Sequence, residues 1–187
     1  MRGCYFTGAA LHTSVGVTLD SHLVQLHEGP SGAEQITAEY AGKTQTLPYK
    51  RLAGAPLRQL DERLDAVLDK LIGDALAAAE LTPAEQRRTG LFLGSSSFDI
   101  GATEYQYGEA LKEDARALAM ARGSSIGNLA VQLCERFGLR GPDYSFNTAC
   151  TASANALVYA DAMIRSSQLD HALVLGVETY NSITALG

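Results

Sequence analysis

The order of apolar segments in the second half of this 187-residue chain most constrains what it can fold into. Three short runs are typical of buried strands: Thr89 to Ser95, Tyr144 to Thr148 and His171 to Val177. Helical patterns lie between these runs. Because strands that alternate with helices pair in parallel, we predict an α/β fold with a mostly parallel sheet covered by helices on both faces.

Two helices complete this pattern. One begins near Ser124 and ends at Gly138, since apolar residues recur there at steps of three and four. The other, residues 150 to 165, consists mostly of small residues, with only Asp161 and Arg165 charged. A helix with so few charges is predicted to be buried on all sides.

The first half of the chain gives weaker patterns. Cys4 to Ala9 is a short apolar run that predicts a buried strand. Residues 28 to 56 are rich in Gly, Pro, Thr and Ser and indicate loops or irregular edge structure. Apolar residues at helical spacing from Leu57 to Leu76 predict an amphipathic helix, and Thr82-Pro83-Ala84-Glu85 has the form of a capping box. The pattern of residues 95 to 123 is ambiguous: it is typical of a polar, glycine-containing loop, and part of 109 to 121 is compatible with a helix.

Composition excludes several classes of function. The net charge is -6 and no run of basic residues is longer than a pair, which argues against nucleic-acid binding. The N-terminus is too short and polar for a membrane span and lacks a convincing cleavage site. The three cysteines show no CxxC spacing, so we expect no disulfide framework, metal site or cofactor, and a cytoplasmic location.

Cys150 lies in the stretch FNTACTASANAL, among small residues and directly after an apolar segment. The order of strand, cysteine and helix predicts a helix N-terminus at Cys150, where unpaired N–H groups favour negative charge. A thiol in such a place can have a lowered pKa, and the same N–H groups can bind an oxyanion. The alternative is an inert cysteine that packs in the core.

The segment from Gly141 to Thr179 resembles the active-site region of β-ketoacyl-(acyl-carrier-protein) synthases. These condensing enzymes carry a Thr-Ala-Cys-small-small-Ser motif after a Gly-Pro turn. A helix then leads to a strand that ends like Leu175-Gly176-Val177-Glu178. CYFTGAALHTSVG, RTGLFLGSS and SIGNLAVQLCERFGLRGP resemble the preceding elements, whereas residues 20 to 85 match only in outline.

The resemblance implies a thiolase-like fold, of which this chain is the N-terminal half of a five-layer αβαβα architecture. It also implies that Cys150 takes an acyl group from a thioester and then condenses it with a malonyl-carrier thioester. The Cys150 N–H would be one oxyanion donor, with Thr148, Ala149 and Thr151 shaping the turn. Phe98 would line the acyl pocket or belong to the core. The implied partners are acyl carrier protein and a ketosynthase-like chain, identical or different, that forms a dimer.

The chain departs from the family in length. Members have about twice as many residues, and the histidines, lysine and Gly-Phe-Gly loop that complete the site lie in their C-terminal half. We therefore expect residues 1 to 187 to be one domain that ends before its last strand, with a catalytic site that needs a C-terminal half in cis or in trans. His12, His22 and His27 are expected to be solvated in loops, and His171 to open a strand.

Other interpretations of the sequence remain open. The chain is alternatively a non-catalytic dimerisation half similar to a chain-length factor, although those partners typically lack the cysteine. A thiolase, an initiating synthase or a hydrolase fits less well. Cys4 and Cys134 are expected in the core, and Tyr105 and Tyr107 either border the active-site entrance or lie on the surface. The pathway, whether fatty acid, polyketide or aryl polyene, is left open by the sequence.

Overall fold

The computed structural model describes residues 3–29, 32–40, 42–52, 62–98, 100, 111–112 and 126–181. The described residues fall into two compact units. One contains Phe6–Glu80, and the other contains the first residues up to Tyr5 together with Leu81–Asn181. Tyr105, Tyr107 and most of the segment predicted to be partly helical lie outside the described residues.

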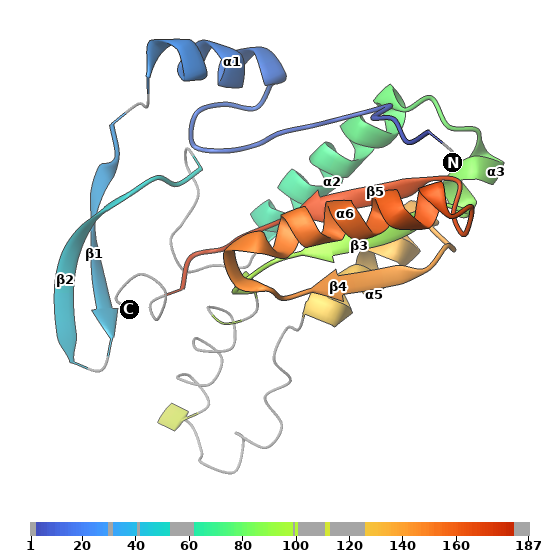
Figure 1. The fold of residues 1–187 in the computed structure, drawn as a ribbon. Coiled ribbons are helices and arrows are strands. Elements are labelled where there is room, and N and C mark those ends of the chain that lie inside the picture. The colour runs from blue at the N-terminus through green and yellow to red at the C-terminus, as the bar shows by residue number, and fades with distance from the viewer. Residues whose placement is uncertain are drawn as a thin grey trace. The chain divides into compact units, whose positions relative to one another are not determined.

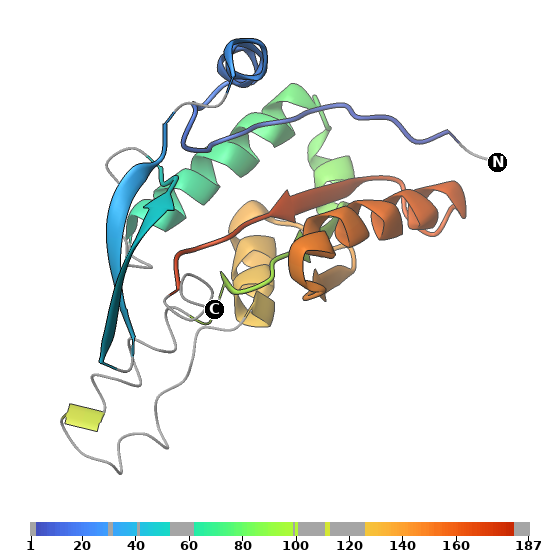
Figure 2. The ribbon, with the colours of Figure 1, turned by 60° about the vertical axis from the view of Figure 1, so that its left-hand side comes forward.

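The unit of residues 81–181 contains the predicted parallel sheet (Figure 1). Its elements in chain order are α3 (Pro83–Arg87), β3 (Gly90–Gly94), α5 (Ile126–Phe137), β4 (Asp143–Phe146), the 3₁₀ turn η2 (Ala149–Thr151), α6 (Ala152–Arg165) and β5 (Ala172–Gly176). The strand order is β4-β3-β5, and both pairings are parallel. Figures 1 and 2 show α6 and α5 on opposite faces of this sheet, which confirms the predicted layers.

The core of this unit lies around the central strand. All five residues of β3 are buried. Helix α6 buries one face, formed by Ala152, Ala156, Ala160 and Met163 at helical spacing. Its opposite face is exposed in this chain, with Val158 66% and Tyr159 42% accessible. The prediction that this helix is buried on all sides therefore holds for one face only.

Local signals in the sequence place the ends of two helices. Thr82 caps α3, and the side chains and backbone of Thr82 and Glu85 bond reciprocally as a capping box. Gly138 ends α5 with φ 66°, a left-handed conformation that glycine adopts without a steric penalty.

The unit of residues 6–80 differs more from the prediction. It contains α1 (Leu19–Glu28), the antiparallel strands β1 (Glu34–Tyr40) and β2 (Lys43–Tyr49), and α2 (Glu62–Ala78). The prediction of loops for residues 28 to 56 was wrong, because these strands form a hairpin. Ile36 and Ala38 alternate with exposed residues and are buried, which is the period of a half-buried strand.

The predicted strand from Cys4 to Ala9 does not form. These residues are assigned to no strand, and Tyr5 and Phe6 are 84% and 82% exposed. A short apolar run forms a strand only where a neighbouring strand supplies hydrogen bonds and packing, and here it has no paired neighbour among the described residues. Cys4 and Cys134 are half-buried rather than core residues.

Candidate functional site

Cys150 lies where the chain turns from β4 into α6. Strand β4 ends at Phe146, and η2 then carries Cys150 into the first residue of α6 at Ala152. Cys150 is exposed. It therefore lies in a 3₁₀ turn directly before the α-helix, and not at the helix N-terminus itself as the sequence predicted. The reversal occurs at Ala149, whose φ of 52° is in the left-handed region that L-residues rarely occupy.

Glycines at the ends of two strands allow α6 to lie directly against the sheet. A Cβ atom on Gly94, at the end of β3, would lie 2.6 Å from the backbone of Ala152 and Ser153. A Cβ on Gly176, at the end of β5, would lie 2.5 Å from the Ser153 hydroxyl. The small residues after Cys150 are therefore required for this close contact, which fixes the start of α6 above the ends of β3 and β5.

A network of three polar side chains holds the turn in place. The Thr151 hydroxyl donates to the Thr148 carbonyl over 2.8 Å. The Asn155 amide donates to the hydroxyl oxygens of Thr148, at 2.8 Å, and Thr151, at 3.3 Å. Asn155 lies one helical turn after Thr151, so it ties the first turn of α6 to the residues on both sides of Cys150. Sequence reasoning missed Asn155, although its spacing of four from Thr151 was a usable signal.

Of the backbone N–H groups at this turn, that of Cys150 remains available to a ligand. The Thr151 N–H donates to the Thr148 carbonyl at 3.3 Å, and the Ala152 N–H donates to the Ala149 carbonyl. No hydrogen bond joins the Cys150 N–H to another residue in the described ranges. Thr151 makes no side-chain cap on α6. A free N–H beside an exposed thiol is the arrangement that oxyanion binding requires.

A second loop lies at the same end of the sheet. The Glu178 carboxylate, just after β5, accepts hydrogen bonds from the Ser97 N–H and hydroxyl, both at 3.2 Å, in the loop after β3. The Thr179 hydroxyl donates to the Phe98 carbonyl at 3.0 Å. Phe98 itself is buried, with 3% of its surface exposed. These bonds join the ends of β3 and β5, and they fix Phe98 in a packed position.

The one histidine in the unit that contains Cys150 among the described residues is His171. His171 directly precedes β5, at the end of the strands away from Cys150, and lies 3.9 Å from the Glu85 carboxylate. His22 and His27 lie in α1, which corrects the loop predicted for them. His22 is half-buried and bonds to Thr13 and to the Thr18 carbonyl. Within the described residues, no group of three or more His, Cys, Asp or Glu side chains could hold a metal ion.

The other two cysteines differ from Cys150. Burial is the main cause that raises the pKa of the Cys134 thiol above its ordinary value. It also raises the pKa of Cys4, together with a hydrogen bond to Asp161. A raised pKa disfavours the nucleophilic thiolate, so neither thiol is suited to attack a thioester. None of the helices described in the structure is long and apolar enough to cross a membrane.

The comparisons with known proteins agree with this architecture. Residues 8–186 match the family model described as β-ketoacyl synthase, N-terminal domain. The 3-oxoacyl-[acyl-carrier-protein] synthase 1 of Haemophilus influenzae is 24% identical over 195 residues, which cover 95% of this chain and 47% of that protein.

Two solved structures share the fold. A β-ketoacyl synthase from Burkholderia phymatum superimposes with a TM-score of 0.69 at 19% identity, over 96% of this chain and 48% of that one. The ketosynthase ApeO of Xenorhabdus doucetiae, solved in complex with its chain length factor ApeC, gives 0.65 at 18% identity, over 98% and 50%. The fold is therefore thiolase-like.

The chain spans about half the length of these three proteins. It also matches a much longer polyketide synthase protein from Streptomyces orinoci, of which it covers 5% at 34% identity over 69% of this chain. The family match extends over almost the whole chain and includes both the parallel sheet and the turn at Cys150. The chain belongs to the β-ketoacyl synthase family of condensing enzymes, and it contains the N-terminal domain of that family.

Proposed function

We propose that Cys150 is the nucleophile that accepts the acyl group in a decarboxylative condensation. The observation that carries this proposal is that Cys150 is exposed in a turn held by side-chain hydrogen bonds. Its backbone N–H donates to no described residue. The turn leads into α6, and the N–H groups of a helical first turn favour the negative charge of a thiolate and of an oxyanion.

The acylation step balances as a thioester exchange. The Cys150 sulfur attacks the carbonyl carbon of an acyl thioester, and the bond from that carbon to the sulfur of the carrier breaks. The carrier thiol leaves with the proton that Cys150 loses. A malonyl thioester then loses CO₂, and the enolate carbon attacks the acyl group and releases Cys150. The Haemophilus relative is named for an acyl-carrier-protein substrate, and we propose a carrier protein as the donor here.

Four further residues support this role. Thr148, Ala149 and Thr151 shape the turn, because the left-handed Ala149 reverses the chain and the two threonines bond across it. We assign Phe98 to the wall of the acyl pocket, since its loop lies at the same end of the sheet as Cys150. The condensation also needs groups that stabilise the enolate, and in the family these lie in the C-terminal half.

A second polypeptide region would cover the exposed face of α6. Leu157, Val158 and Tyr159 are 39%, 66% and 42% exposed, which is unusual for apolar side chains on the central helix of a domain. We propose that a C-terminal ketosynthase half, in cis or in trans, packs there. Val158→Glu should change the free energy of unfolding of this chain by less than about 0.5 kcal/mol, because the side chain is exposed. It should weaken the binding of the C-terminal half, because the interface would bury a charge without a partner.

Strand β4 offers a second contact. It lies at one edge of the described sheet, and three of its four residues are exposed. Tyr144 on this strand stacks with Phe92 and meets the ring of Tyr159 edge-on. We propose that β4 faces a second ketosynthase-like chain, as ApeO is paired with its chain length factor. Light scattering at micromolar concentration should report a dimer, and a monomer would contradict this assembly.

The experiment that tests the function is reconstitution with a ketosynthase C-terminal half. Release of ¹⁴CO₂ from a malonyl-carrier thioester should require both halves, and Cys150→Ala should abolish formation of the condensed product. Cys134→Ala is the matched control and should keep the activity. If Cys150→Ala left condensation intact, the chain would be a non-catalytic partner similar to a chain-length factor.

A further inference from the structure

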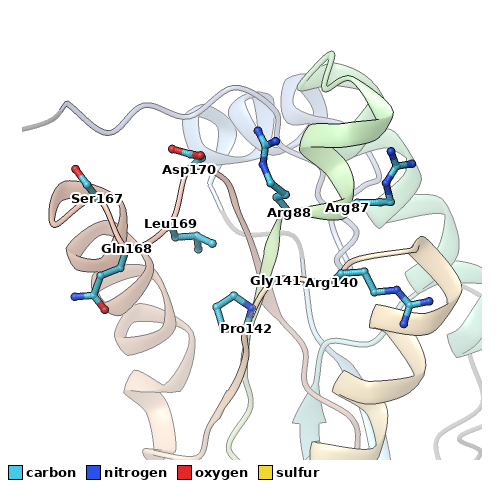
Figure 3. Close-up of a pocket in the computed structure, with 9 residues that line it drawn as sticks. All are labelled: Arg87, Arg88, Arg140, Gly141, Pro142, Ser167, Gln168, Leu169 and Asp170. Atoms are coloured by element: carbon cyan, nitrogen blue, oxygen red, sulfur yellow. The ribbon is translucent and has the colours of Figure 1, made fainter.

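A groove of about 470 Å³ lies at the end of the sheet away from Cys150 (Figure 3). Three connections form it: the end of α3 before β3, the loop before β4, and the loop between α6 and β5. The charged and polar side chains that line it are Arg87, Arg88, Arg140, Ser167, Gln168 and Asp170.

The three arginines are exposed, and in the part of the chain that the structure describes their closest electrostatic contact is the effect of Arg88 on the nearby Glu85 carboxylate and of Arg140 on the Cys134 thiol. No ion pair and no side-chain hydrogen bond joins their guanidinium groups to another described residue. The nearby carboxylate of Glu85 is already bound by Thr82, whose N–H and hydroxyl donate to it at 2.9 and 2.6 Å. Asp170 makes an interaction of its own.

Backbone contacts hold the segments that carry two of these arginines against each other. The Arg140 N–H donates to the Arg87 carbonyl at 2.8 Å, and the Gln86 amide donates to the Phe137 carbonyl at 2.8 Å. The loop that carries Arg140 is thereby fixed against the end of α3. Positive charges carried on adjoining segments make the potential along the groove positive, so an anion bound there would be attracted.

The arrangement favours an extended anion over a small one. Figure 3 shows Arg87 and Arg140 on the side of the groove opposite Ser167 and Gln168, with Arg88 between, so the guanidinium groups do not converge on one point. A single phosphate group is bound by donors that converge on it. Separate carboxylates along a peptide would meet the arginines one by one.

We propose that this groove binds an acidic segment of a partner polypeptide. The chain as a whole carries a net charge of -6, whereas the groove is lined by three arginines and one aspartate. The groove is therefore positive on a protein that is negative overall. Because the groove lies at the opposite end of the strands from Cys150, the bound segment would anchor a partner without entering the acylation site. The proposal does not depend on the proposed function.

Fluorescence anisotropy with the full chain tests the proposal. The probe is a fluorescein-labelled decapeptide of alternating Glu and Ser, measured at low and at physiological salt. We expect binding that weakens with salt and a loss of about threefold to a hundredfold in affinity for Arg87→Gln/Arg88→Gln/Arg140→Gln, because three exposed ion pairs to the peptide are lost at once. The single variant Arg88→Glu should weaken binding in the same direction, and circular dichroism reports whether each variant is folded.

The matched control changes the same amount of charge elsewhere. Lys43→Gln/Lys50→Gln/Lys70→Gln removes three exposed positive charges from the other unit and should change the affinity by less than about twofold. If both triple variants weakened peptide binding equally, the net charge of the chain would explain the binding and the proposal would be overturned. Absence of peptide binding, or displacement of the peptide by an equal concentration of inorganic pyrophosphate, would overturn it as well.

Discussion

The two ends of the three-stranded sheet are built from different kinds of side chain. At the end with Cys150, glycines and alanines bring α6 onto the strands, and hydroxyl and amide groups hold the turn. At the other end, exposed arginines line an open groove. The first end depends on close packing and fixed geometry, whereas the second depends on charge. Substitutions should therefore affect the two ends through different physical terms.

The largest effect on stability is expected at Gly94. Gly94→Ala would place a Cβ 2.6 Å from the backbone of Ala152, which has no flexible end to move aside. Overpacking of this kind costs about 1–3 kcal/mol and occasionally more, so we expect a loss of at least about 2 kcal/mol in denaturant unfolding. Gly73→Ala is the control, because a Cβ there meets nothing within 4 Å and a helical alanine should stabilise α2 by up to about 1 kcal/mol.

That comparison also tests why the residues around Cys150 are small. Similar unfolding free energies for Gly94→Ala and the unaltered chain would mean that α6 does not rest on the end of β3. The close contact would then not be the reason for the small residues.

A smaller effect is expected at Asn155. Asn155→Ala removes two hydrogen bonds that hold Thr148 and Thr151, each of which contributes about 0.5–1.5 kcal/mol net. We expect the rate of Cys150 alkylation by iodoacetamide to change by about three- to tenfold and its pH profile to shift, with little change in the labelling of Cys134. Asn155→Gln should restore part of the rate. Identical pH profiles for Asn155→Ala and the unaltered chain would remove Asn155 from this positioning role.

The smallest effect is expected at Glu85, beside the arginine groove. Hydrogen bonds from the Thr82 side chain and backbone lower the pKa of the Glu85 carboxyl below its ordinary value. A lowered pKa in the folded state stabilises the protein above the ordinary pKa of about 4.3, and this stability is lost as the pH falls through the lowered value. Glu85→Gln should therefore lower Tm at pH 7, and the difference from the unaltered chain should close below about pH 4.

Thermal unfolding followed across this pH range checks that expectation. A Tm difference that stays constant from pH 7 to pH 3 would show that the Glu85 charge does not contribute through its bonds to Thr82.

The sequence predicted the unit of residues 81–181 well because each of its signals is local. The capping box at Thr82, the glycine after α5 and the apolar run of β3 each define their own element. The unit of residues 6–80 was predicted less well. Its hairpin depends on the pairing of two polar strands, in which Ile36 and Ala38 of β1 are the buried residues among the side chains that the structure describes. The apolar run from Cys4 pairs with no strand among the described residues, which the sequence of the run cannot reveal.

At the candidate site, the sequence singled out Cys150 as a nucleophile, which stays a prediction, and it could not define the turn that carries this residue. The left-handed conformation of Ala149 is set by the contacts on both sides of it, since alanine has no intrinsic preference for this region. The bond from Asn155 to Thr151 has a local spacing that the sequence could have revealed, whereas its bond to Thr148, seven residues away across the turn, depends on the fold. The arginine groove brings together Arg87 and Arg140 through a backbone bond that only the fold creates.

The central claim is that Cys150 accepts an acyl group, and peptide mapping after incubation with an acyl-carrier thioester tests it most directly. The account predicts one acyl group on the peptide that contains Cys150, none on the peptides of Cys4 and Cys134, and no acylation of Cys150→Ala. Absence of one oxyanion donor slows such a reaction by about 10²–10³, so the incubation must be long enough to detect slow acylation. Equal acylation of all three cysteines, or acylation that survives Cys150→Ala, would contradict the account.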